Sequence, residues 1–143
     1  MLDDLKEFVK EIGPQEGKYL VSCFHQKGDW KVDFYDPKKH KILTFTKVDG
    51  KTKSQEDDIF QKEDKDIEEL DLERVKISRL EALEQLGESA DKVITIIQVI
   101  DSKVVWNITV ITSSFDVYNV RVDAETGEKI SEHKESIFNF KKK

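Results

Sequence analysis

Apolar side chains recur at two different spacings along this chain, and the spacing changes from segment to segment. Between residues 2 and 12 they return every three or four positions, which places them on one face of a helix. Gly13 and Pro14 follow at once. Proline removes a backbone donor and disfavours helical backbone in the residue before it. The pattern therefore predicts an amphipathic helix over residues 2–12.

The spacing then changes to two. Apolar and polar positions alternate over residues 18–26 and 30–35, and residues 42–48 form a further extended run. Short turn sequences, Lys27-Gly28-Asp29 and Asp36-Pro37-Lys38-Lys39, separate these segments. Alternation with a period of two is typical of antiparallel strands that have one wetter face. Three antiparallel strands are therefore predicted after the first helix.

A second helix is predicted near residue 78, followed by more strands. Ser78 and Glu81 have the spacing of a capping box, in which each side chain accepts from the other residue's backbone amide. Gly87 is the expected stop signal of this helix. Extended patterns follow over residues 93–100, 104–112, 115–123 and 128–134, and the joints after the first two are of hairpin size.

Both halves are thus expected to be a helix followed by an antiparallel meander. This predicts an α+β fold of two such units related by an internal duplication, with an N-terminal unit over residues 1–48 and a C-terminal unit over residues 76–143. Residues 49–75 hold 16 charged side chains among 27 positions and are expected to be mainly a solvated, acidic linker.

The charge balance argues against nucleic acid as a partner. The chain has a net charge of −6, and residues 49–75 contain 11 acidic and 5 basic side chains, which equals the whole excess. A nucleic-acid-binding protein would show a basic face. The only basic run is the short tail Lys141-Lys142-Lys143. We therefore expect no nucleic-acid partner.

Membrane and targeting signals are not evident in the sequence. No stretch approaches the roughly 18 apolar residues that cross a bilayer, so no membrane span is expected. The first residues carry acids where a signal peptide carries bases. The chain as it stands is expected to be cytoplasmic, or extracytoplasmic if a leader or anchor has been removed. Cys23 is the only cysteine, so no internal disulfide can form.

One region of the sequence resembles a known protein family. Lys76-Ile77-Ser78, Ala82-Leu83 and a strand pair that closes on a glycine turn are similar to the PepSY domain, over residues 76–134 most clearly and over 2–48 as a degenerate copy. The resemblance is most specific in the turn itself, at Asp123, Ala124, Thr126, Gly127 and Glu128. Such domains resemble cystatins, with a helix packed on a curved antiparallel sheet. The resemblance implies a noncatalytic module of the kind found in propeptides that inhibit metallopeptidases.

The candidate chemistry is weak. Asp123, Glu125 and Glu128 lack the carboxylate ladder of a calcium loop, so the turn is interpreted as structural. Cys23 and His25 share a strand face, but no oxyanion motif or orienting residue accompanies them. The histidines have no zinc spacing. We therefore expect no catalytic residue, no metal, no cofactor and no enzyme activity.

The segment of residues 93–100 is the most suggestive feature for binding, because it is apolar on both faces. A helix-covered antiparallel sheet has one dry face, so such a strand needs a second cover. The cover could come from the other half of the chain, a dimer mate or a protein ligand. The predicted interaction surface comprises Val93, Ile94, Ile96, Ile97, Val99, Ile100, Trp106, Ile108 and Val110.

Three functions follow from these observations. The leading hypothesis is a noncatalytic protein-interaction or regulatory module, peptidase-binding or inhibitory by its resemblance, whose sheet surface or edge binds an unidentified protein or peptide. The second is a self-associating structural protein with a homodimer seam at residues 93–100. The third is a small-ligand carrier that uses a concave sheet face around Trp30, Phe34 or Trp106.

Overall fold

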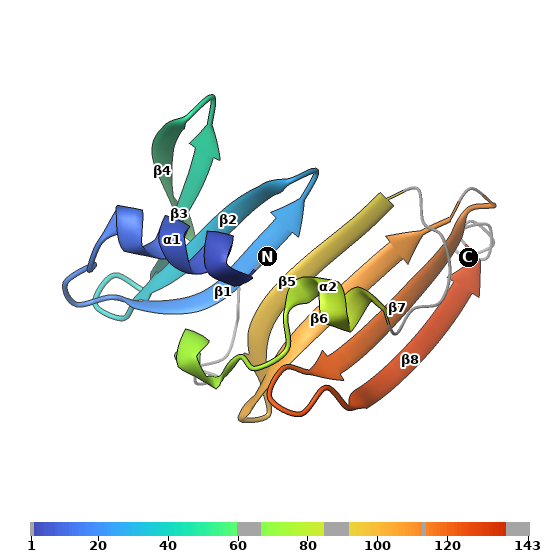
Figure 1. Ribbon diagram of the computed structural model, residues 1–143. Helices are drawn as coiled ribbons and strands as arrows, with labels where there is room; N and C mark the ends of the chain where they lie inside the picture. The colour runs from blue at the N-terminus through green and yellow to red at the C-terminus, as the bar shows by residue number, and fades with distance from the viewer. Residues whose placement is uncertain (1, 60–66, 85–91, 113, 137–143) are drawn as a thin grey trace.

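The chain folds around a single antiparallel sheet of eight strands (Figure 1). The computed structural model describes residues 2–59, 67–84, 92–112 and 114–136. The spatial order of the strands is β4-β3-β2-β1-β5-β6-β7-β8. Their bounds are Tyr19–Gln26 for β1, Asp29–Asp36 for β2, Lys41–Val48 for β3, Lys51–Asp58 for β4, Lys92–Ile100 for β5, Lys103–Ile111 for β6, Asp116–Asp123 for β7 and Lys129–Ser136 for β8.

The pairing of β1 with β5 joins the two halves of the chain into this one sheet. Four residue pairs make the contact, and Cys23 opposite Ile97 and Phe24 opposite Ile96 lie at its centre. Side chains of directly opposed residues share a face. Cys23 and Ile97 are both 0% exposed on the face that the helices cover. Phe24 and Ile96 therefore lie on the other face.

Both helices lie on the same face of the sheet, α1 (Leu2–Ile12) over the first half and α2 (Arg79–Leu83) over the second (Figure 1). A 3-10 turn, η1 (Leu72–Arg74), precedes α2. Leu5 and Phe8, which lie on the apolar stripe of α1, are buried against the sheet. Near α2, the indole Nε1 of Trp106 donates a hydrogen bond to the backbone oxygen of Ile77 at 2.8 Å. The core is therefore a single layer between the helices and one face of the sheet.

The prediction of an α+β fold made of two duplicated helix-plus-meander units is wrong. One continuous antiparallel sheet dominates the structure, and α2 has only five residues against 11 in α1. The expected PepSY-like and cystatin-like architecture of each unit is corrected with it. Two separate meanders would each leave the edge groups of an apolar strand unpaired, whereas in the structure β1 and β5 pair with each other and join the halves into one sheet.

The acidic segment is also more ordered than expected for a linker. Lys51–Asp58 forms β4, which pairs with β3 along its whole length although every residue in it is exposed. Further on, the amide of Leu70 donates to the oxygen of Leu20 at 2.7 Å, and Leu70 and Val75 are buried. An edge strand with both faces in water has no alternation of apolar and polar residues, so its sequence resembles a linker.

Other local predictions are confirmed. Helix α1 ends at Ile12, the seven predicted strands form within two residues of their expected bounds, and the Ser78–Glu81 capping box is present. Gly87 and the Lys141–Lys143 tail lie outside the described residues. Within the described ranges, no helix combines the length and the apolar character that crossing a membrane requires.

Shortening one side chain on each face of β5 tests which face of this strand is buried in the core. We expect Ile97→Ala to lower the free energy of unfolding by about 2–5 kcal/mol, because it opens a cavity in a fully buried site. Ile94→Ala is the matched control on the same strand, and its half-buried side chain should cost clearly less. Urea unfolding measures both, and equal losses would contradict the assignment of faces.

Candidate functional site

The predicted interaction surface divides between the two faces of the sheet. Ile97, Trp106 and Ile108 are 0% exposed in the core. Val110 is buried with them, and Val93 and Val99 pack against this core from its margin. Ile94, Ile96 and Ile100 lie half-buried on the opposite side, which we call the open face. Within the described ranges, both helices cover the other side (Figure 1). The accessible part of the predicted surface is therefore these three isoleucines.

An unbroken register row crosses the open face through Phe24 and Ile96. Each member is directly paired with the next, from β4 at one edge to β8 at the other. We call it the central row, and its members in order are Lys53, Thr46, Lys31, Phe24, Ile96, Asn107, Arg121 and Ser131. Because directly opposed side chains are neighbours, the row has an apolar centre with cationic positions on both sides.

Polar side chains beside the central row bond to one another. The Asp33 carboxylate accepts from the Thr44 hydroxyl at 2.6 Å and from the Ser22 hydroxyl at 3.0 Å. The Asn119 amide donates to the Asn107 side-chain oxygen at 2.8 Å, and Asn107 donates to Gln98 at 3.2 Å. These contacts fix side chains across neighbouring strands, so the open face presents a preorganised polar surface.

A groove hollows the open face over β1–β4. One cavity of about 610 Å³ adjoins another of about 360 Å³, and the two share Phe24, Lys31, Thr46 and Val48 as lining residues. Lys53 lines the larger cavity together with Lys31 and with the carboxylates of Asp33 and Asp57. Val48 is 42% exposed, so the groove has accessible apolar surface. The groove is large enough to receive side chains of a partner.

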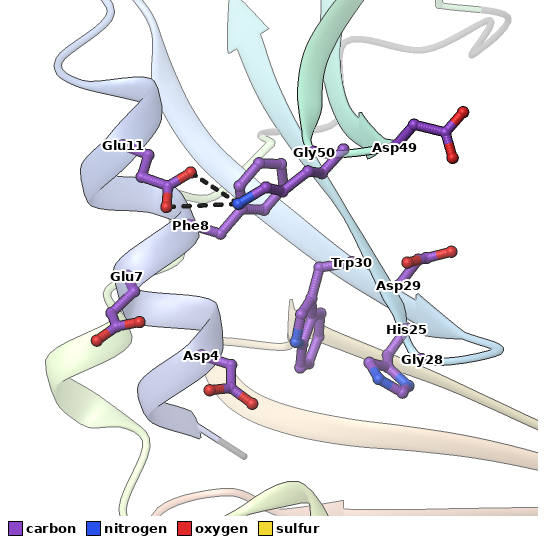
Figure 2. A pocket seen from close by; sticks show the side chains of 11 residues that line it. Asp4, Glu7, Phe8, Glu11, His25, Gly28, Asp29, Trp30, Asp49 and Gly50 are labelled. Carbon is purple, nitrogen blue, oxygen red and sulfur yellow. Dashed lines mark hydrogen bonds and ion pairs between the residues drawn. The ribbon is translucent and has the colours of Figure 1, made fainter.

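A second, acid-lined pocket lies on the helix side of the sheet (Figure 2). Its volume is about 430 Å³, and its carboxylates come from α1, from the first residue of β2 and from the turn after β3. Lys47 Nζ lies 3.2 Å from a Glu11 carboxylate oxygen, and the rings of Phe8 and Trp30 also line the pocket. The acidic members are Asp4, Glu7, Glu11, Asp29 and Asp49. The lining of this pocket is more acidic than that of the groove, where Lys31 and Lys53 lie with the carboxylates of Asp33 and Asp57.

Cys23 and His25 do not form a nucleophilic pair. Burial raises the pKa of the Cys23 thiol well above its ordinary value, with a smaller contribution from Asp33, so the thiol stays protonated. Burial, and next the Arg79 charge, lower the pKa of His25 to about 4. Arg79 Nε donates to His25 Nδ1 at 3.0 Å, which occupies the acceptor nitrogen of the neutral ring. The histidine is a packing and hydrogen-bonding residue at neutral pH.

The glycine turn is held by hydrogen bonds within it and to the segment before α2. The Asp123 carboxylate accepts from the amides of Glu125 at 2.8 Å and Thr126 at 3.2 Å, and Gly127 has a φ of +83°. The Thr126 hydroxyl accepts from the amide of Glu128. Ala124 is 0% exposed, and its oxygen accepts from the amides of residues 76 and 77. The turn therefore anchors the segment before α2 rather than presenting a ligand site.

In the parts of the chain that the structure describes, no three histidine, cysteine or carboxylate side chains gather in a way that could hold a metal ion. Trp30, Phe34 and Trp106 are at most 7% exposed and belong to the core, and Trp30 also lines the acid-lined pocket.

Comparisons with known proteins inform the fold more than the function. No family model matches the chain. Over 47 residues, 33% of this chain and 25% of the relative, it is 43% identical to a Lactobacillus gasseri protein named "Putative RNA (cytidine(34)-2'-O)-methyltransferase". The matched part is thus about a quarter of that relative. The PepSY-like resemblance of residues 76–134 stays a prediction.

The fold itself has a solved counterpart. A crystal structure of a putative lipoprotein from Clostridium difficile 630 superposes with a TM-score of 0.68 at 14% identity, covering 93% of this chain and 91% of that chain. At this level of identity the likeness concerns the fold alone. The architecture of a single curved sheet with helices on one side therefore recurs in another protein of similar length.

Several residues of the open face were missed from the sequence. Phe24, Lys31 and Arg121 lie on three strands that only the register brings into line. Local alternation does place each of them opposite its buried neighbours, so their face could be inferred. Their alignment could not, because the pairing of β1 with β5 joins segments about 70 residues apart in sequence and leaves no local signal.

Alanine substitutions at two glycines with the same φ angle can separate the cost of backbone strain from the cost of a packing clash. Gly127 and Gly28 both have a φ of +83°, but a Cβ at Gly127 would lie 3.2 Å from Ile77 Cδ1, whereas at Gly28 it would meet nothing within 4 Å. We expect Gly28→Ala to cost about 1–2 kcal/mol from backbone strain alone. Gly127→Ala should cost more, measured by urea unfolding. Equal losses would show that the Ile77 contact contributes nothing.

Stability should fall in acid through His25. Its folded-state pKa of about 4 lies below the ordinary value of 6.5, so between these pH values the unfolded chain binds a proton that the folded chain rejects. The contribution is present above pH 6.5 and is lost as the pH falls toward 4. Urea midpoints measured at pH 7.5 and 4.5 should differ less in His25→Gln than in the unchanged protein. An NMR titration of His25 near pH 6.5 would contradict this account.

Proposed function

We propose that this chain is a noncatalytic module that binds a partner protein with the open face of its sheet. The observation that carries the proposal is the half-buried apolar stretch of Phe24, Ile94, Ile96 and Ile100, which lies on the side of the sheet opposite both helices. Contiguous apolar surface with a polar surround is typical of protein interaction sites.

The edges of the sheet are less suited to binding than its face. β4 carries Lys51, Lys53 and three consecutive acids, and β8 alternates charges of both signs. Charged edge strands hinder the pairing of another strand. We therefore place the partner on the open face and not at an edge, which narrows the two options that the sequence left open.

The chemistry of the described residues supports a noncatalytic role. The Cys23 thiol is buried with a raised pKa, and the Asp33 carboxylate is engaged by two hydroxyl groups. A catalytic group would need a perturbed pKa together with access to a substrate. Peptidases remain the partner class that the PepSY-like turn implies, and they belong in any panel of candidate partners.

The compartment also belongs to this proposal. The sequence predicts a cytoplasmic protein as the chain stands, with an extracytoplasmic location as the alternative. The name of the Clostridium difficile neighbour, a putative lipoprotein, favours the alternative. Detection of the endogenous protein in fractionated cells would decide between the two.

A charge placed on the open face should abolish binding. We expect Ile96→Asp to weaken peptides or proteins selected by display against the intact chain at least tenfold, because about 1.4 kcal/mol of lost contact is tenfold in affinity. Leu80→Asp is the matched control, since Leu80 is 49% exposed on α2 at the other side of the sheet. Calorimetry measures affinity, and circular dichroism confirms that both variants stay folded.

Two results would contradict the proposal. If Leu80→Asp abolishes binding and Ile96→Asp does not, the partner binds the helix side. If light scattering shows a dimer that Ile96→Asp dissociates, a second copy of the chain occupies the open face and the self-association hypothesis is supported instead.

A further inference from the structure

The ion pairs that the described residues form do not include the cations of the central row. Among the described residues, no carboxylate forms an ion pair with Lys53, Lys31 or Arg121. Lys31 Nζ instead lies 5.9 Å from the centroid of the Phe24 ring. The neighbouring Asp33 carboxylate accepts from Ser22 and Thr44, not from a lysine. The row therefore presents cations without an ion-pair partner among the described residues on both sides of an apolar centre, although Asp33 and Asp57 line the same groove as Lys31 and Lys53.

The spacing of these cations has a definite length. Lys31 on β2 and Arg121 on β7 are four strand steps apart, which is roughly 19 Å at the usual interstrand distance. An extended chain that crosses the strands advances about 20 Å in six residues and returns its side chains to the same side every second residue. Residues i and i+6 of such a chain would therefore reach the two cations.

We propose that the central row recognises an extended acidic and apolar segment of a partner protein, with carboxylates six residues apart at Lys31 and Arg121. The side chain at i+2, about 7 Å along the row, lies between Phe24 and Ile96, and the side chain at i+4, about 13 Å along it, lies between Ile96 and Asn107. Lys53, on the far wall of the groove, receives a further acidic group beyond position i. This inference rests on the proposed function and names the chemistry of its partner.

The charges favour an acidic peptide over a basic peptide or a nucleic acid. A basic segment would meet the cations along the row, and electrostatic complementarity disfavours such a pairing. A nucleic acid gains affinity from many neutralised phosphates, whereas the whole chain carries a net charge of −6. A segment with two separated carboxylates and apolar side chains between them matches both the charge and the apolar centre of the row.

The test uses designed peptides and the full chain. The probe is a nine-residue capped peptide, Gly-Glu-Ser-Leu-Ser-Leu-Ser-Glu-Gly, whose glutamates are six residues apart with leucines between them. One comparison peptide replaces both glutamates by glutamine, and another moves the second glutamate by one position. Calorimetry at low and physiological salt measures affinity. We expect the probe to bind at least tenfold more tightly than either comparison peptide, and more weakly as salt rises.

Variants of the protein locate the contact. Lys31→Gln and Arg121→Gln should each weaken the probe several-fold and leave the glutamine peptide unaffected. Lys38→Gln is the matched control, because Lys38 is exposed in the turn between β2 and β3 and lines neither cavity of the groove. Urea unfolding checks that the variants keep their stability.

The outcomes separate this inference from the proposed function. If the glutamine peptide binds as tightly as the probe and Ile96→Asp still abolishes binding, the acidic specificity is wrong and the open face remains the binding site. Tighter binding of a single-stranded oligonucleotide than of the probe overturns the inference as well. If no probe binds and the selected partners ignore Ile96→Asp, both the inference and the proposed function fail.

Discussion

The pairing of β1 with β5 is the interaction on which the rest of the structure depends. Four residue pairs join two meanders into one sheet, and they place Cys23 and Ile97 in the core while Phe24 and Ile96 face outward. Without this contact each half would expose an edge strand rich in apolar residues, which is a recognised aggregation hazard. The same contact makes the central row continuous from β4 to β8. The pairing of β1 with β5 therefore determines both the fold and the candidate binding surface.

The two sides of the sheet differ in the side chains that they present. On the helix side, buried aromatic and aliphatic side chains form the core, and the pocket at its margin is lined by carboxylates from α1, from the start of β2 and from the turn after β3. On the open face, the Asp33 carboxylate and asparagine amides form cross-strand hydrogen bonds, and the three cations of the central row have no ion-pair partner among the described residues. A partner that approaches this protein would thus meet a more acidic surface at the helix-side pocket than along the central row.

Much of the local structure could be predicted from the sequence. The helical stripe of residues 2–12, the Ser78–Glu81 cap and the alternation of seven strands are short-range signals, and each is confirmed. The way the strands join could not be predicted, because the β1 and β5 pairing has no local mark. β4 was missed for a different reason, since an edge strand with both faces in water is charged throughout and lacks alternation.

The predicted binding surface shows the same limit. Residues 93–100 were correctly recognised as apolar on both faces, but which face the core would claim depends on what lies opposite. Ile97 is 0% exposed on the side of the sheet that the helices cover, whereas Ile96, one residue earlier, is half-buried on the open face. Because the residues on both faces of this strand are mostly apolar, the sequence does not indicate which face is buried. The register with β1 determines which face of β5 is buried, because it places Ile97 opposite the buried Cys23.

The central claim is that the open face is bare in the free protein and positioned to bind. Hydroxyl-radical footprinting with peptide mass spectrometry tests it most directly, since side-chain oxidation follows exposure to water. The account predicts that Phe24 and Ile96 are oxidised measurably while Trp106, an intrinsically more reactive side chain that is 0% exposed, is protected. Protection of Phe24 and Ile96 equal to that of Trp106 in the free monomer would show that the chain covers its own open face, and would contradict the account.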